Sequence, residues 1–234
     1  MANDEVKKKG GCLGKLMGLL VFATIVGLGA ALYFVTQPQD LTDLQESPAA
    51  AARGVSPDRD LRQVLEKAIQ GDHSVNLSEK ELNRWLGSQL ELEQGGALAS
   101  NVSLKRVWVR LREGVAEVII ERDVAGFPMT TSMFLQVEQL ETATGMRTNV
   151  HLHGGGFHES VPVPTRGGRF GQLTVPQGFL NMVMPDFVKL AEVFQPEIEL
   201  GFEKMARIRI KDKRLELDPS PPKRKTNGGA ESTF

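Results

Sequence analysis

The stretch that decides the fold runs from residue 107 to residue 120 and reads VWVRLREGVAEVII. Its centre, Glu113-Gly114, has the composition of a tight turn. Apolar side chains recur at every second position on both sides of this turn, at Val107, Val109, Leu111, Val118 and Ile120. Because successive side chains of a β-strand point to opposite faces, this period predicts a β-hairpin with one apolar face.

The same period continues downstream and extends the hairpin to a four-stranded meander. After Gly126, apolar residues share one face as far as Val137, and after Gly145 they do so as far as Leu152. Glycines and prolines between these runs mark the turns. Further on, residues 173–175 predict a short strand and residues 208–217 a final hairpin.

Segments with a 3.6-residue period predict three helices, over residues 57–70, 79–91 and 177–194. Ser56 is suited to cap the first helix, and Ser78 with Glu81 forms a capping box for the second. Pro185 should kink or divide the third helix, because it lacks the backbone donor. The sequence therefore predicts an α+β domain, in which a curved antiparallel sheet packs its apolar face on these helices.

An uncharged apolar stretch, residues 16–35, precedes the domain and predicts one N-terminal transmembrane helix. At about 1.5 Å per residue it spans roughly 30 Å, the thickness of a hydrocarbon core. Lys7, Lys8 and Lys9 precede it, and no Lys or Arg follows until Arg53. This asymmetry predicts a cytoplasmic N-terminus and an exported domain. A signal peptide cleaved after Ala31 is the alternative interpretation.

These features divide the chain of 234 residues into five parts. They are a basic cytoplasmic flank (1–15), the transmembrane helix (16–35), a linker (36–56), the exported α+β domain (57–218) and a disordered tail (219–234). The linker is rich in Pro and Ala, and the tail is polar. The single cysteine, Cys12, lies on the cytoplasmic flank, so the exported domain has no disulfide.

Composition and motifs exclude several functions. The 28 basic and 29 acidic side chains nearly balance, unlike the strongly basic surface of a nucleic-acid-binding protein. The sequence has no P-loop, no dinucleotide fingerprint and no Gly-x-Ser-x-Gly nucleophile elbow. We therefore expect a non-enzymatic protein with no catalytic residues, no cofactor and no nucleic-acid partner.

The best candidates for metal chemistry are His151 and His153, which strand alternation places on one face. His158 and Glu159 follow after three glycines. The same face carries Arg147, which favours solvated histidines and predicts no metal site. A metal-dependent enzyme that uses His151 and His153 is the least favoured function.

Apolar side chains gather near the third predicted helix. Flexible Met and rigid Phe side chains suit an adaptable apolar pocket, although they also occur in an ordinary core. The candidate ligand-binding residues are Phe179, Leu180, Met182, Val183, Met184 and Phe187. The leading function is a membrane-anchored envelope protein that binds membrane lipid, or another lipid-like apolar ligand, or a partner at the membrane surface.

Small residues in the membrane helix offer another possibility. Ala23, Gly27 and Ala31 recur at four-residue spacing, a pattern that lets a second helix approach closely. The alternative function is therefore a structural subunit of a membrane complex, with a membrane-protein partner at this face.

The order of elements, with LSEKELNRWL at residues 77–86 and GQLTVP at residues 171–176, resembles the YpmS-type group of membrane-anchored bacterial proteins. The resemblance implies a single-pass protein of the bacterial inner membrane, with a cytoplasmic N-terminus and a periplasmic or extracellular C-terminal domain. It implies no catalytic residues, and neither His151-x-His153 nor the glycine-rich segment matches a feature of the group.

Overall fold

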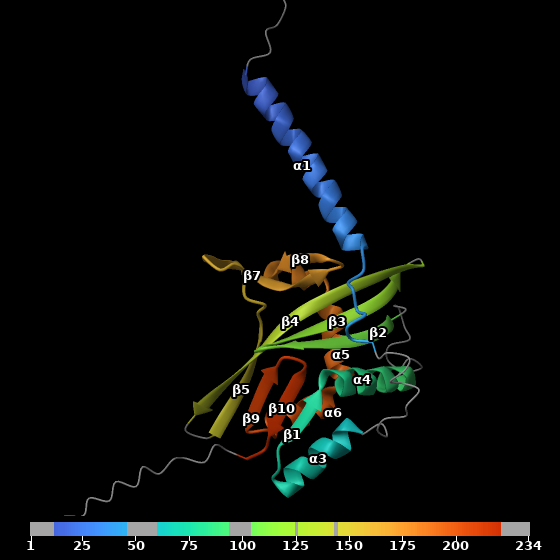
Figure 1. Ribbon diagram of the computed structural model, residues 1–234, viewed down its shortest axis with the longest axis vertical. Coiled ribbons are helices and arrows are strands. Elements are labelled where there is room, and N and C mark those ends of the chain that lie inside the picture. The colour runs from blue at the N-terminus through green and yellow to red at the C-terminus, as the bar shows by residue number, and fades with distance from the viewer. Residues whose placement is uncertain (1–11, 46–59, 94–103, 125, 143–144, 221–234) are drawn as a thin grey trace, which may run out of the picture.

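The computed structural model describes residues 12–45, 60–93, 104–124, 126–142 and 145–220. Helix α1 (Cys12–Thr36) projects from one end of an α+β domain (Figure 1). Residues Leu13–Thr36 form a helix that is long and apolar enough to cross a membrane, a property that a signal sequence shares. The predicted fold class, an α+β domain after one long apolar N-terminal helix, is confirmed.

The domain is built around a curled antiparallel sheet, shaped like half of a barrel (Figure 1). The strand order is β2-β3-β4-β7-β6, and β5 also pairs with β4 while β8 pairs with β7. These strands are β2 (Leu104–Arg112), β3 (Val115–Val124), β4 (Phe127–Thr142), β5 (Gly145–Leu152), β6 (Gly156–His158), β7 (Val161–Phe170) and β8 (Leu173–Pro176). The predicted meander β2-β3-β4-β5 is confirmed.

Strand β7 was not predicted, because its prolines and glycines conceal the apolar alternation of a strand. Its glycines are needed where it crosses β4. Gly168 lies opposite Met133, and a Cβ added to Gly168 would overlap the carbonyl oxygen of Ser132. Strand β4 thus pairs with β7 over residues 131–133 and with β5 over residues 135–142.

Helices cover the inner face of the curled sheet. They are α3 (Leu61–Gly71), α4 (Glu79–Glu93), α5 (Met184–Val193) and α6 (Gln195–Ile198), with the 3-10 helix η1 (Gln177–Met182) and the π-helical turn η2 (Glu199–Glu203). The capping box is confirmed: the carboxylate of Glu81 accepts from the Ser78 N–H at 2.9 Å. The third predicted helix is divided at Val183, with Pro185 in the first turn of α5.

The first predicted helix differs at its start. Asp60 caps α3 by accepting from the Arg62 N–H at 3.1 Å, whereas the predicted cap, Ser56, lies outside the described residues.

A second, smaller sheet closes one end of the half-barrel. It has the order β1-β10-β9, with β1 at Val75–Ser78, β9 at Arg207–Lys211 and β10 at Arg214–Asp218. The final hairpin is as predicted, whereas the four-residue β1 gives no period of its own. The Lys213 N–H donates to the Leu111 carbonyl and the Gly114 N–H donates to the Ile210 carbonyl, which joins the two sheets.

Helix α4 protects the free edge of β2. The side chain of Asn83 pairs with both backbone groups of Val109, accepting from its N–H at 2.6 Å and donating to its carbonyl at 2.8 Å. One turn earlier, Glu79 accepts from the Leu111 N–H at 2.7 Å. Asn83 and Glu79, one helical turn apart, thus satisfy three backbone groups at the edge of β2.

We expect Glu79→Ala to lower the free energy of unfolding by about 1–3 kcal/mol, because it leaves the buried Leu111 N–H without an acceptor. Glu79→Gln should cost less, since it keeps an acceptor.

Burial raises the pKa of Glu79, so this carboxyl favours the folded state most below its unfolded-state pKa and loses that contribution as the pH rises. Urea unfolding at several pH values tests this. The free energy of unfolding of Glu79→Gln, relative to that of wild type, should increase as the pH rises above the ordinary pKa of Glu.

The matched control is Glu216→Gln. The hydrogen bond from Lys211 lowers the pKa of Glu216. The free energy of unfolding of the wild type should therefore increase, relative to that of Glu216→Gln, as the pH rises. A pH-independent difference between Glu79→Gln and wild type would contradict the account of Glu79.

The part of the expected linker that the structure describes is not a free tether. Residues 37–45 run along the outer face of the sheet, where Leu41 and Leu44 are buried with Trp108 and Ile119. Burying a leucine stabilises a fold by about 1.5–3 kcal/mol, enough to hold this segment in place. Residues 36–56 were predicted to be a linker because they are rich in Pro and Ala, and Leu41 and Leu44 alone give no period.

Candidate functional site

The inner face of the half-barrel and the helices enclose an apolar cavity of about 460 Å³. Pockets for small molecules typically have volumes of about 300–1,000 Å³. The walls come from α3, α4, α5 and α6, from strands β2 to β5 and from the smaller sheet. Among the lining residues are Leu61, Leu65, Leu82, Trp85, Leu86, Val109, Ala116, Val118, Leu135, Val137, Phe187, Phe202, Ile210 and Leu215.

Strand alternation builds the sheet wall of the cavity. Ala116 lies opposite Leu111 on β2 and opposite Leu135 on β4, and all three side chains line the cavity. Because neighbouring strands in register present the same face, the apolar alternation of the sequence becomes a continuous apolar surface.

The cavity opens to solvent between β5 and the helices α5 and α6. Val150, Val188 and Ile198 line the cavity and are each about half exposed, at 47%, 48% and 39%. Glu197 is the only ionisable residue among the lining residues. The cavity is therefore suited to an apolar molecule, with one carboxylate in its wall.

The structure separates the predicted ligand-binding residues. Met184 and Phe187 line the cavity. Leu180 is fully buried beside Gly167 and Gly168, and Val183 packs against the main core without lining the cavity. The other two, Phe179 and Met182, are exposed on η1. The break at Val183 turns η1 away from α5. The residues of one apolar stripe in the sequence therefore lie partly in the cavity wall and partly on the exposed surface of η1.

Sequence reasoning missed most of the cavity lining. The apolar faces of α3, α4 and the meander were identified, but they were predicted to pack on one another, and only residues of the third predicted helix were assigned to a pocket. Their alternation was the available signal, and it does not distinguish a filled core from a hollow one.

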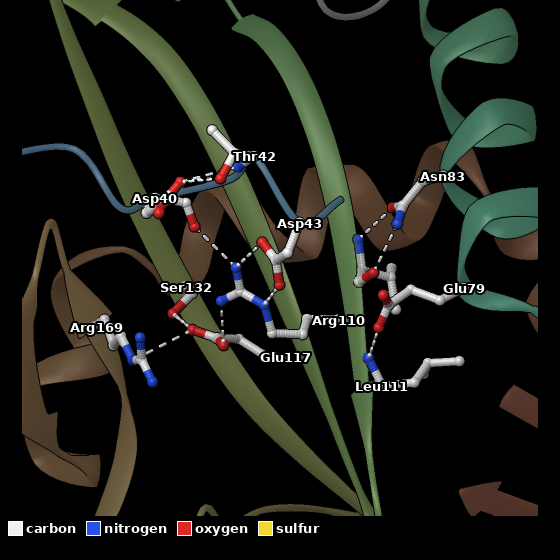
Figure 2. Close-up of polar contacts among 11 residues, drawn as sticks. Asp40, Thr42, Asp43, Glu79, Asn83, Arg110, Leu111, Glu117, Ser132 and Arg169 are labelled. Atoms are coloured by element: carbon white, nitrogen blue, oxygen red, sulfur yellow. Dashed lines mark hydrogen bonds and ion pairs between the residues drawn. The ribbon is translucent and has the colours of Figure 1, made fainter. Parts of the chain in front are cut away.

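The outer face of the sheet carries a buried charge cluster, drawn in Figure 2. Arg110 donates to both carboxylate oxygens of Asp43, at 2.8 and 3.0 Å, and to the backbone carbonyl of Asp40 at 2.9 Å. On its other side it donates to Glu117 at 3.3 Å. Glu117 also accepts from the Ser132 hydroxyl at 2.7 Å. One guanidinium thus joins residues 40–43 to the middle of the sheet.

The electrostatics of this cluster favour a structural role. Burial alone would lower the pKa of Arg110, but the hydrogen bonds to Asp43 and the charge of Glu117 outweigh it and raise the pKa. The hydrogen bonds from Thr42 lower the pKa of Asp40. Arg110 pairs with Asp43 and Glu117, and the Asp40 carboxylate accepts from Thr42, so the charges of the cluster serve contacts within it.

His151, His153 and His158 each contact a different residue. His151 pairs with Glu138 at 3.2 Å, His153 accepts from the Gly155 N–H at 3.0 Å, and His158 contacts the Ser160 hydroxyl at 2.6 Å. Among the residues that the structure describes, no group of three or more His, Cys, Asp or Glu side chains could hold a metal ion.

The small residues of α1 face outward. Ala23 and Gly27 are exposed and Ala31 is half-buried, and an added Cβ on Gly27 would meet no atom within 4 Å. A helix–helix contact at this face stays a prediction.

Comparison with known proteins found no matching family model and no significantly similar curated protein. The resemblance to the YpmS-type group stays a prediction.

Proposed function

We propose that this protein is a membrane-anchored, non-enzymatic protein whose domain binds an apolar, lipid-like ligand between the curled sheet and its helices. The apolar cavity of about 460 Å³ carries the proposal. An acyl chain or a similar apolar molecule matches its lining, in which Glu197 is the one ionisable residue.

The energetics of an apolar cavity support an occupant. The cavity opens to solvent at one side and its wall is almost wholly apolar, so a ligand that enters it removes apolar surface from water. Water finds few hydrogen-bonding partners along this wall, whereas an apolar ligand makes dispersion contacts with it.

The membrane placement rests on α1 and its flanks. Three lysines precede the helix, and Asp40 and Asp43 follow it. The proposed topology is a single-pass inner-membrane protein with a cytoplasmic N-terminus and an exported domain. Anchoring would keep the domain close to lipid at a high effective concentration.

The proposal is tested by titrating the full-length protein in detergent with cis-parinaric acid, a fluorescent fatty acid. Trp85 lines the cavity, so bound probe should quench its emission by energy transfer. We expect saturable binding to wild type and a loss of at least about tenfold in affinity for Ala116→Phe, equivalent to about 1.4 kcal/mol, because the added ring occupies the cavity.

The matched control is Gln136→Phe, which adds a phenyl ring to an exposed position beside Leu135. It should bind the probe as wild type does. Urea unfolding must show that both variants are folded. Equal binding by wild type and Ala116→Phe, or no saturable binding by wild type, would refute the proposed ligand site.

A further inference from the structure

Six apolar side chains are exposed at the end of the domain from which α1 leaves. We refer to them as the apolar rim; they are Phe127, Phe157, Val161, Val163, Phe179 and Met182. Phe127, Val163 and Met182 are the most exposed, at 73%, 72% and 68%. Soluble monomers seldom group large exposed apolar residues, and such groups mark surfaces that contact a partner or a membrane.

Four elements contribute to the rim, namely β4, β6, β7 and η1. Phe127 is at the tip of the β3–β4 hairpin, three residues lie on β6 and β7, and two on η1. In Figure 1 the β3–β4 tip, β7 and β8 lie level with the end of α1 along the long axis of the molecule. Helix α1 contacts β7 and β8, and η1 contacts both of these strands.

The end of α1 is joined to the domain by hydrogen bonds. The Gln172 N–H donates to the Phe34 carbonyl at 3.0 Å, and Gly171 approaches the carbonyls of Phe34, Val35 and Gln37 so closely that a Cβ would overlap them. Directly afterwards, the Gln39 N–H donates to the Thr130 hydroxyl at 2.9 Å. These contacts and the packing of residues 37–45 hold the end of α1 against the sheet.

We propose that the apolar rim is a membrane-contact face, which inserts into the interfacial region of the same bilayer that α1 spans. The proposal rests on the anchor part of the proposed function. We infer a bilayer as the partner because the end of α1 and the rim lie at the same height along the long axis of the molecule. If α1 crosses the membrane, the rim lies at the membrane surface. Phe side chains are typical of apolar faces that bury at the boundary between headgroups and acyl chains, and Phe127, Phe157 and Phe179 supply three of the six.

This contact would fix the position of the cavity mouth. The mouth residues Val150, Val188 and Ile198 lie on β5, α5 and α6, none of which contributes to the rim. The rim would hold the domain on the membrane while leaving the mouth open to the side.

The test uses the full chain with Cys12→Ser, which removes the only cysteine, and single cysteines at chosen positions. These are Phe127→Cys and Met182→Cys on the rim, Leu140→Cys near the far end of β4, and Val26→Cys within α1. Each is labelled with the fluorophore NBD in detergent and reconstituted into phosphatidylcholine–phosphatidylglycerol vesicles, with or without lipids that carry a nitroxide on the acyl chain.

We expect blue-shifted emission and nitroxide quenching at positions 26, 127 and 182, and neither at Leu140, which is 45% exposed. Quenching at position 26 but not at 127 and 182 would overturn the membrane-contact face and leave the anchor intact. In that case a blue shift at 127 and 182 without quenching would identify a protein contact instead. No quenching at position 26 would refute the anchor, and with it the proposal, while the cavity would still be tested by probe binding.

Discussion

Replacing Arg110 with methionine is expected to lower the free energy of unfolding by about 3–5 kcal/mol, the usual cost of breaking a buried ion pair by removing one partner. The Glu117 side chain is only 3% exposed and would lose its closest cation. Its remaining partners are the Ser132 hydroxyl and Arg169, which lies 3.5 Å away. The measurement is urea unfolding of the full-length protein in detergent, followed by tryptophan emission.

Two further variants separate the charge effect from lost packing. Arg112→Met, two residues along the same strand and exposed, should change stability by no more than about 0.5 kcal/mol. The double variant Arg110→Met/Glu117→Met should be more stable than Arg110→Met alone, because no unpaired charge stays buried. If the double variant is the less stable of the two, the cost comes from packing and the electrostatic account is wrong.

The second large effect is expected for Gly171→Ala, which should lower the free energy of unfolding by about 2–4 kcal/mol. Gly171 has a φ of +55°, which favours glycine, and its missing Cβ leaves room for three carbonyls at the end of α1. Alanine must therefore strain the backbone and push α1 away from the sheet. Urea unfolding measures the loss.

Proteolysis shows where the change acts. Leu41 and Leu44 are buried in the wild type, so thermolysin should cleave there much faster in Gly171→Ala. The matched control is Gly178→Ala on η1, where an added Cβ meets no atom within 4 Å, and it should behave as wild type. Unchanged cleavage at Leu41 and Leu44 in a destabilised Gly171→Ala would contradict a role for Gly171 in this joint.

Local periodicity was sufficient for most of the elements. The alternation from Val107 to Ile120 gave the first hairpin, and the capping box at Ser78 gave the start of α4, since both signals depend only on neighbouring residues. The position of Pro185 gave the break between η1 and α5, because a proline cannot continue the hydrogen bonding of the preceding turn. Strand β7 was not predicted. Its glycines are required by close contacts with Ser132 and Gln177, and these contacts are not visible in the local sequence.

The candidate site could be predicted only in part. Met184 and Phe187 were identified and line the cavity, whereas Phe179 and Met182 belong to the opposite side of the helix break. An apolar stripe predicts that its side chains avoid water. It does not predict whether those side chains contact other side chains or line an open space.

By itself the sequence determined the long apolar helix, the α+β class and the faces of the strands, because each follows from residue spacing along one segment. The tertiary structure alone decided which side chains line the cavity between the curled sheet and its helices. It also decided that residues 37–45 pack on the sheet, through a contact between Asp43 and Arg110 across 67 positions. Both depend on how distant segments fill space together, and no local period contains that information.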